Sequence, residues 1–393
     1  MSYKTIQLSK TADIIIGFPF ASEKFNINAQ GIRLVRGKNI TTGNLRWGDD
    51  TRWWDDSSID LSKYMLKADD IVIGMDGSLV GKNYAKISEN DLPLLLVQRV
   101  ACIRAKEGYD QRFLWGCIAS GKFERYIDSI KTGTSIPHIS GGQIGNYLIP
   151  DFDLPTQKKI AAILSALDEK IATNRAINDN LLEQMQAIYK SWFVDYLPFG
   201  GEMPESWTQT GIYSLANIIY GAPFASKQFN TEGSGKPIIR IRDLKDQQFA
   251  TYTTEVHPKG YLLRPGDIVV GMDGEFRPYI WGNDEAWLNQ RVCVFENKRP
   301  KGKAFLYFTI KPLLYAIEQT QVATTVIHIG KKDYDAFEIM LPDDATLDSF
   351  DSLTAPMIMQ IVSNSFENKR LAAMRDALLP KLMSGEINIV TIK

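Results

Sequence analysis

The sequence predicts an α+β protein made of two tandem, mainly β domains. Each domain is followed by a long helix, and the two helices pair as an antiparallel coiled coil. Three observations predict this fold. The chain has 393 residues, enough for about two to four domains. Its two halves match each other in order. Each half ends in a long segment whose apolar residues recur at heptad spacing.

The internal repeat is the strongest of these observations. Residues 17–26 match residues 221–230 at seven of ten positions, and residues 70–77 match residues 267–274 at seven of eight. Further matches join 98–100 to 290–292 and 134–139 to 324–329. The offset between the copies falls from 204 to 197, 192 and 190 along the chain. The second copy therefore has the same elements with shorter loops between them.

Short β-branched segments bounded by Gly, Pro and Asp predict the strands of each domain. These segments are 71–73, 94–97 and 100–103 in the first copy, and 268–270 and 291–295 in the second. Residues 109–130 and 303–320 carry apolar residues at helical spacing and predict one or two short helices in each copy.

A long helix is predicted after each domain, because residues 156–195 contain no Pro or Gly and a seven-residue apolar stripe runs through them. The residues predicted to pair the helices and to dock partners are Leu164, Leu167, Ile171, Asn174, Asn178, Leu181, Met357, Ile361, Asn364, Asn368 and Leu371. In an antiparallel pair, Asn174 and Asn178 face Asn368 and Asn364, which satisfies polar groups within an apolar seam. Thr354 and Arg375 interrupt the second stripe.

The predicted domain borders follow from these segments. The first domain covers residues 1–152 and its helix 153–197, whereas the second domain covers 198–343 and its helix 344–393. Pro198, Gly200, Gly201 and Pro204 end the first helix.

Composition excludes several classes of protein. There are 45 Lys and Arg against 46 Asp and Glu, so any binding to nucleic acid must use local patches. The three cysteines show no metal-binding or disulfide spacing, which favours a reducing cytoplasm. No stretch approaches the roughly 18 apolar residues of a membrane span, and we expect no membrane association.

Two similar domains held apart by a stiff spacer suit an extended ligand, because the second contact becomes nearly intramolecular. Double-stranded DNA is the natural ligand of this kind, since its helical repeat makes the spacing of half-sites a geometric quantity.

The repeated motifs resemble the specificity (S) subunit of type I restriction-modification enzymes. The resemblance rests on 17–22 and 221–226, on 70–77 and 267–274, and on 149–157 running into 160–171. The second copy departs from the pattern at 341–346, which lack the Pro-Thr-Gln of 155–157. The resemblance implies two target-recognition domains that each read half of a bipartite DNA target. It also implies helices that set the gap and dock two methylation (M) subunits, and separate restriction/motor (R) subunits. S-adenosylmethionine and ATP would then belong to those partners, and this chain would hold no cofactor or metal.

Motifs for catalysis are missing from the sequence. There is no Asn/Asp-Pro-Pro-Tyr/Phe run, no phosphate-binding GxxxxGK[ST] loop and no HExxH, and there are only three histidines. We therefore expect a non-catalytic subunit. His138 and His328 occupy matching positions, where packing is favoured over a phosphate contact. Asp76-Gly77 and Asp273-Gly274 are typical of turns.

The repeat itself sorts the candidate DNA contacts. What the two copies share is scaffold or sequence-independent phosphate contact, and what differs in the same loop is a candidate for reading bases. Shared candidates are Arg36, Lys38, Arg240 and Arg242, for which solvated strand charges are an equal alternative. Arg99 and Arg291 either position the DNA backbone or brace the fold. Lys131, Thr134 and Thr324 come from a threonine-containing loop. Candidates in the differing loops are Arg46, Arg52, Lys82 and Asn83 in the first copy, and Glu275, Arg277 and Tyr279 in the second.

Two other functions compete with this hypothesis. One is a coiled-coil scaffold or adaptor protein without nucleic-acid binding, which the near-zero net charge favours slightly. The other is a self-sufficient DNA-modifying enzyme, which the absent methyltransferase motif disfavours.

Overall fold

The computed structural model describes residues 4–132, 137–320 and 328–387. The chain forms two compact units. The first contains Met1–Glu169 with Leu371–Lys393, and the second contains Lys170–Arg370. Each unit therefore holds one copy of the repeat together with a segment of each long helix.

The first unit is built around a five-stranded sheet. Its order is β2 (Ala12–Ile16), β9 (Val100–Ala105), β6 (Ile71–Gly74), β7 (Tyr84–Lys86) and β4 (Thr42–Gly43). A three-stranded sheet contains β5 (Trp53–Trp54), β3 (Ile32–Val35) and β8 (Leu94–Leu96), and β1 (Thr5–Gln7) pairs with β10 (Leu148–Pro150). The helices are α1 (Leu8–Thr11), α2 (Gln111–Ala119), α3 (Lys122–Ile130) and α4 (Gly141–Gly145).

The second unit repeats this plan. Its four-stranded sheet has the order β12 (Ala216–Tyr220), β20 (Val292–Asn297), β17 (Ile268–Gly271) and β18 (Pro278–Ile280). A five-stranded sheet follows the order β13 (Phe229–Asn230), β15 (Tyr252–Thr253), β14 (Lys236–Ile239), β19 (Ala286–Leu288) and β16 (Leu262–Leu263). β11 (Thr208–Gly211) pairs with β21 (Glu338–Leu341), and the helices are α6 (Lys303–Thr320) and α7 (Lys331–Asp335).

Alternation along the central strands explains why both faces of each main sheet are covered. Ile71 and Ile73 pack in one cluster with α2 and α3, whereas Val72 packs on the other face with β3 and β8. In the second unit, Ile268 and Val269 divide between two clusters in the same way. Successive side chains of a strand point to opposite faces, so an all-apolar strand must be buried on both. The predicted strands and the tandem repeat are confirmed.

The long helices are α5 (Leu154–Phe193) and α8 (Asp344–Met383), each of 40 residues. Both begin within one residue of the predicted borders but end before the predicted residues 197 and 393. Tyr196 has φ 53°, directly before Leu197-Pro198, and Gly385 has φ 63°. These left-handed residues end the helices, as they commonly do at a helix C-terminus.

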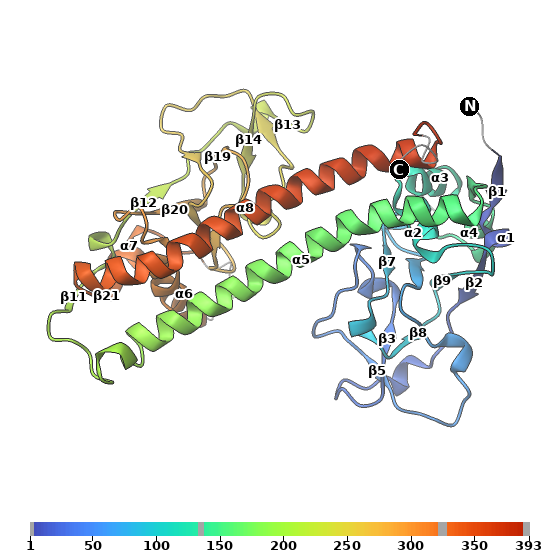
Figure 1. Ribbon diagram of the computed structural model, residues 1–393, viewed down its shortest axis with the longest axis horizontal. Helices are drawn as coiled ribbons and strands as arrows, with labels where there is room; N and C mark the ends of the chain where they lie inside the picture. Colours follow the sequence, from blue (N-terminus) through green and yellow to red (C-terminus); the bar gives the residue numbers. More distant parts are fainter. Residues whose placement is uncertain (1–3, 133–136, 321–327, 388–393) are drawn as a thin grey trace. The chain divides into compact units, whose positions relative to one another are not determined.

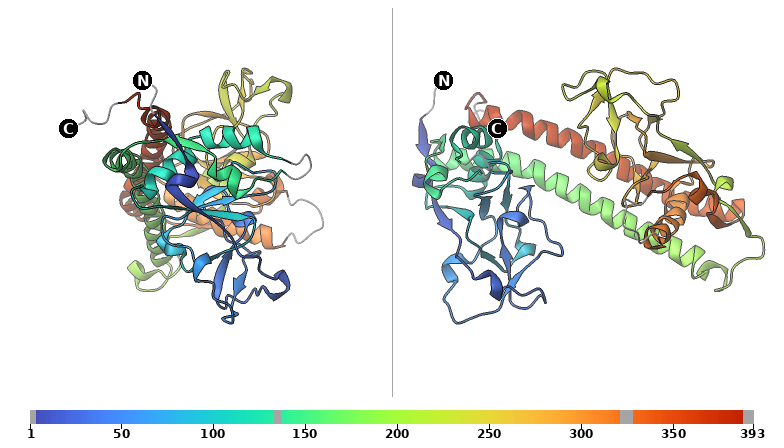
Figure 2. Two further views of the ribbon diagram at one scale, coloured as in Figure 1. Left: turned by 90° about the vertical axis from the view of Figure 1, so that its right-hand side faces the viewer. Right: turned by 180° about the vertical axis from the view of Figure 1, so that it is seen from behind.

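Within each unit the helix segments pair antiparallel, and two views show them side by side (Figures 1 and 2). In the first unit, Leu164 of α5 packs in the core with Leu379 and Met383 of α8. In the second unit, Met185 of α5 shares a core with Ile358 and Ile361 of α8. The predicted antiparallel pairing is therefore confirmed within both units.

The asparagines pair as the sequence predicted. In the second unit, Asn174 Nδ2 donates to Asn368 Oδ1 at 3.0 Å, and Asn364 Nδ2 donates to Asn178 Oδ1 at 2.8 Å. Each pair of amides is therefore joined by one direct hydrogen bond inside the apolar seam.

Both interruptions of the second stripe also have partners. In the second unit, Thr354 is buried and its hydroxyl donates to the carbonyl of Phe350 at 2.9 Å. In the first unit, Arg375 Nη1 donates to Asp168 Oδ1 of α5 at 2.9 Å. The stripe therefore tolerates a hydroxyl and a guanidinium because each finds an acceptor.

The two long helices are anchored differently at their starts. In the first unit, buried Gln157 accepts a hydrogen bond from the amide of Asp110 at 2.9 Å and donates to the carbonyl of Phe152 at 2.7 Å. Gln157 belongs to the Pro-Thr-Gln segment that the second copy lacks.

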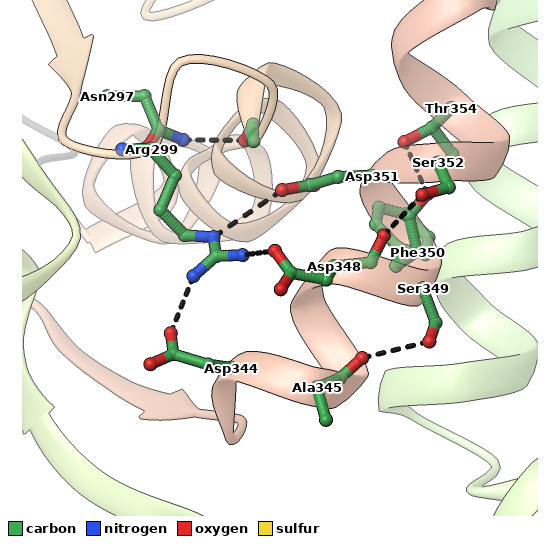
Figure 3. A network of polar contacts seen from close by, with 11 residues as sticks. Asn297, Arg299, Asp344, Ala345, Asp348, Ser349, Phe350, Asp351, Ser352 and Thr354 are labelled. Carbon is green, nitrogen blue, oxygen red and sulfur yellow. Dashed lines mark hydrogen bonds and ion pairs between the residues drawn. The ribbon is translucent and has the colours of Figure 1, made fainter.

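Arg299 binds the first turns of α8. Figure 3 shows Arg299 pointing at three carboxylates in the first turns of that helix. Its guanidinium donates to Asp344 at 2.5 Å, to Asp348, and through Nε to Asp351 Oδ2 at 3.4 Å. Acidic residues also suit the positive end of a helix dipole. Arg299 therefore ties the first turns of α8, which lack the Pro-Thr-Gln segment, to its domain.

Among the helices that the structure describes, none combines the length and the apolar character that a membrane crossing needs.

All three cysteines are free and buried. Burial raises the pKa of the Cys293 thiol to about 12, so this thiol stays protonated at neutral pH.

Candidate nucleic-acid interface

The same unusual turn occurs in both units, between the strands β8 and β9 and between β19 and β20. Val100 N donates to Val97 O at 3.2 Å, and Val292 N donates to Asn289 O at 3.3 Å. The third residue is Arg99 in the first turn, with φ 65°, and Arg291 in the second turn, with φ 70°. A turn that needs positive φ at this position normally has Gly or Asn there. An arginine holds the position in both copies.

Each arginine lies beside the Asp-Gly turn that follows the central strand. Asp76 Oδ2 is 3.5 Å from Arg99 Nε, and Asp273 Oδ1 is 3.7 Å from Arg291 Nη1. Gly77 has positive φ, as does its counterpart Gly274. The predicted Asp-Gly turns are confirmed, and their carboxylates face the paired arginines.

A histidine completes each site. The backbone of His138 bridges Asp76, and that of His328 bridges Asp273. His328 Nδ1 lies 2.6 Å from Asp273 Oδ1 and 3.0 Å from Arg291 Nη1. The ring of His138 lies instead beside the hydroxyl of Thr132, with Nε2 at 3.3 Å. We call these two groups the Arg-Asp-His corners: Arg99, Asp76 and His138 in the first unit, and Arg291, Asp273 and His328 in the second.

The corners expose their arginine side chains to solvent. The side chain of Arg99 is 67% exposed and that of Arg291 is 53% exposed. Backbone hydrogen bonds hold them in place, because Met75 N donates to Arg99 O at 2.9 Å and Met272 N donates to Arg291 O at 2.8 Å. Each unit thus carries an exposed guanidinium at an equivalent, fixed place.

Arg36 and Arg240 lie in a different environment. Each is half-buried, with its guanidinium carbon 5.8 Å from the ring of the equivalent Phe25 or Phe229. Each donates within its own unit, Arg36 to the carbonyl of Asp50 and Arg240 to the hydroxyl of Thr251. Burial lowers the pKa of Arg36. These contacts favour bracing of the loop over contact with phosphate.

The neighbouring cations Lys38 and Arg242 are exposed. Lys38 Nζ lies 2.8 Å from Asp50 Oδ2, and Arg242 Nε lies 3.6 Å from Asp243 Oδ1. The Lys38–Asp50 pair is exposed on both sides and opens at little cost, so Lys38 can exchange its carboxylate for a phosphate. Asp243 is buried, whereas the side chain of Arg242 is 64% exposed beside it.

Candidates in the differing loop of the first unit are mostly held by their own domain. Arg46 Nε donates to Lys38 O at 2.9 Å, and Arg52 Nη1 donates to Thr51 O at 2.8 Å. Lys82 Nζ lies 3.2 Å from Glu124 Oε1. Asn83 is buried. Trp47 and Trp54 pack in hydrophobic clusters, so the tryptophans serve the core.

In the second unit, the candidates differ sharply from one another. Arg277 donates to both carboxylate oxygens of Glu318, with Nη2 to Oε1 at 3.0 Å, and it lies over the ring of Tyr315. Tyr279 is half-buried in β18. Glu275 is exposed and directly follows the Asp273-Gly274 turn. Of the three, Glu275 is the most accessible to a ligand.

The threonine-containing loop is only partly described. Lys131 is exposed and pairs with Asp128 at 2.7 Å. Thr134 and Thr324 lie outside the described residues.

Sequence reasoning missed two features of the corners. It treated Asp76 and Asp273 only as turn residues, and it did not detect the left-handed backbone of the arginines. One signal was available, because an Arg stood at the same place in the short link between two strands in both copies. Within the described segments, no group of three or more His, Cys, Asp or Glu could hold a metal ion.

Comparison with known proteins agrees with this architecture. The family model of the type I restriction modification DNA specificity domain matches residues 20–183 and again residues 204–360. The specificity subunit of the Escherichia coli type I restriction enzyme EcoBI is 38% identical over 139 residues, which are 35% of this chain and 29% of that protein. The MjaIX specificity subunit of Methanocaldococcus jannaschii is 24% identical over 327 residues, covering 78% of this chain and 75% of that protein.

A solved structure shares the fold. The crystal structure of the type I restriction-modification system S subunit from M. genitalium superposes with a TM-score of 0.57 at 16% identity, covering 98% of this chain and 96% of that one. The two matched domains make up most of the sequence, and they coincide with the two copies of the repeat. The chain therefore belongs to the DNA specificity domain family of type I restriction-modification systems, a family of specificity subunits and not of catalytic ones.

Proposed function

We propose that this chain recognises a bipartite double-stranded DNA target and directs partner adenine methyltransferase subunits, and restriction subunits, to it. Each domain would read one half of the target. One observation carries the proposal: an exposed arginine beside an Asp-Gly turn stands at the equivalent place in both units. A doubled site of this kind suits a ligand that offers the same chemical group twice, as the phosphate backbone does.

Contacts to DNA would then divide into two kinds. The shared corners, with exposed Lys38 and Arg242, would hold phosphates without regard to sequence. Exposed residues of the differing loops, such as Glu275, would read base edges. The chain has a net charge of −1, so its affinity must come from these local groups and not from overall attraction.

The paired helices would set the gap between the two half-sites. Each helix has 40 residues, which corresponds to about 60 Å if it is straight. The paired asparagines support this role, because amides that need partners select a single register. The outer faces of the helices would dock two methylation subunits, with S-adenosylmethionine and ATP held by the partner subunits. Three buried free cysteines suit a reducing cytoplasm.

A gel-shift assay tests this proposal. Random-sequence and genomic duplexes are incubated with the chain alone, with its neighbouring methylation subunit alone, and with both. We expect tight, sequence-selective binding and adenine methylation only when both proteins are present. A scaffold or adaptor protein would bind no DNA in any mixture, and a self-sufficient enzyme would methylate without the partner. Either result would contradict the proposal.

A further inference from the structure

We infer that Arg99 and Arg291 are sequence-independent phosphate anchors whose side chains are kept at a cost in backbone strain. This inference rests on the proposed DNA-binding function and assigns two specific contacts to it. Its basis is a comparison of equivalent left-handed residues in the described parts of the two domains that precede the long helices.

At two pairs of equivalent left-handed positions, both copies have glycine. Gly31 and Gly235 match each other with φ 89° and 85°, and Gly77 and Gly274 match with φ 93° and 79°. These positions need a left-handed backbone, and glycine adopts it without a steric penalty. Both copies of the repeat have therefore kept glycine where the turn requires it and no side chain is needed.

Other left-handed residues that are not glycine occur in only one of the two copies. Ala29, Asp69 and Gln247 have positive φ, and the equivalent positions of the other copy are Gly233, Gly266 and Gly43, each also with positive φ. At each of these three positions, one of the two copies has glycine, which adopts positive φ without a steric penalty. Arg99 and Arg291 are the one equivalent pair in the described repeat that is left-handed in both copies and has glycine in neither. Strain kept in both copies indicates that the arginine side chain is needed in both.

The ligand for these side chains is the DNA backbone. The same residue type stands in both domains while the neighbouring loops differ, so the two arginines meet a group that does not depend on the sequence of the half-site. Phosphate is such a group, and the planar fork of arginine binds its oxygens well. At 3.5 Å and 3.7 Å the aspartates orient the guanidinium groups without closing over them. The side chains stay more than half exposed and open to a ligand.

The test uses Arg99→Gly and Arg291→Gly in the full chain bound to its methylation subunit. Glycine suits the left-handed turn, so these variants are expected to fold and to raise the Tm by about 2–4 °C. Binding to a specific duplex is measured by fluorescence anisotropy at several salt concentrations. Each variant should bind about 5-fold more weakly at moderate salt, and its slope of log K against log [salt] should become less negative by about 0.9. The double variant should change the slope by about 1.8.

Arg112→Ala is the matched control. Arg112 is an exposed arginine on α2 whose Nε lies 3.7 Å from Asp69, so its substitution removes the same charge from the same unit. Its salt slope should equal that of the wild type.

Three outcomes would overturn the inference or the function. Unchanged slopes in both glycine variants, with normal binding by the wild type, would overturn the inference alone. A fall in Tm would show that the turn is not strained, which removes its basis. Absence of DNA binding by the wild-type complex would instead overturn the proposed function.

Discussion

Asn364 Nδ2 donates a hydrogen bond to Asn178 Oδ1 at 2.8 Å, joining α8 to α5 inside the seam of the second unit. The neighbouring pair, Asn174 and Asn368, makes the equivalent contact at 3.0 Å. A shift of one helix along the other would separate these amides and leave them facing apolar side chains. The two pairs therefore specify the register of the helices at this point.

Replacing one asparagine of a pair should cost more than replacing both. Asn364→Leu leaves the Asn178 amide without its partner and should lower the free energy of unfolding by about 1–3 kcal/mol. The double variant Asn178→Leu/Asn364→Leu should recover most of this loss, because two apolar residues suit the seam. Urea unfolding of both single variants and the double variant gives the coupling energy. Additive effects of the two substitutions would contradict the pairing.

Substitution of Arg299 is expected to destabilise the protein by an amount that depends on pH. Asp351 is buried, and burial raises its pKa, so protonation of this carboxyl favours the folded state. Arg299→Ala removes the cation that balances the charge, and it should lower the free energy of unfolding at pH 7 by about 2–3 kcal/mol. Because protonated Asp351 needs no cation, this difference should shrink as the pH falls from 7 to 5.

Denaturant unfolding of wild type and Arg299→Ala at both pH values measures the effect. Asp344→Asn serves as the control, because the Asp344 side chain is 88% exposed and should change stability little. A stability difference that stays constant between pH 7 and pH 5 would exclude Asp351 as its source.

The Arg277–Glu318 pair predicts a contribution to stability that is lost in acid. The hydrogen bond from Arg277 lowers the pKa of Glu318. A carboxyl whose pKa is lower in the folded state than in the unfolded state stabilises the protein at pH values above the unfolded-state pKa, which is near 4.3 for Glu. This stabilisation is lost as the pH falls through the folded-state pKa of Glu318. Glu318→Gln should therefore cost about 1 kcal/mol at pH 7, and this cost should fall steadily as the pH is lowered below about 4.3. Thermal melting of both proteins across this pH range checks the prediction.

Arg277 is also a candidate for reading bases, and the same pair allows the two roles to be separated. From the sequence, Arg277→Ala is expected to relax the sequence preference at the second half-site only. Glu318→Gln removes the brace but keeps the arginine, so it should leave the methylated sequence unchanged. If Arg277→Ala also leaves that sequence unchanged, Arg277 is only a brace for its domain.

Glu275 is the more accessible candidate in the second unit. A carboxylate accepts a hydrogen bond from the amino group of cytosine, and one good pair is worth about 1–3 kcal/mol of discrimination. Glu275→Ala should therefore broaden the methylated sequence at one position of the second half-site and leave the first half-site unchanged. Sequencing of methylated sites from a randomised duplex library measures this. An identical methylation motif for wild type and variant would remove Glu275 from the set of base-reading residues.

The sequence was sufficient for the features that repeat at a regular spacing. Matching segments predicted two domains of one fold, and the heptad stripe predicted two long helices and the pairing of Asn174 with Asn368. The contacts of Arg36 with Phe25 and of Arg299 with Asp351 could not be predicted. They join segments separated by loops of irregular length, and no periodicity reports on such contacts. The left-handed backbone of Arg99 could not be predicted either, because Gly or Asn, and not Arg, is the residue expected at a turn position with positive φ.

Genome-wide detection of methylated adenine, in a host with and without this chain, tests the central claim most directly. Two domains that each read half of a target predict a set of methylated sites that appears only when the chain is present. Those sites should share two short sequences separated by a gap of constant length. Methylation that does not depend on the chain, or a single uninterrupted motif, would contradict the account.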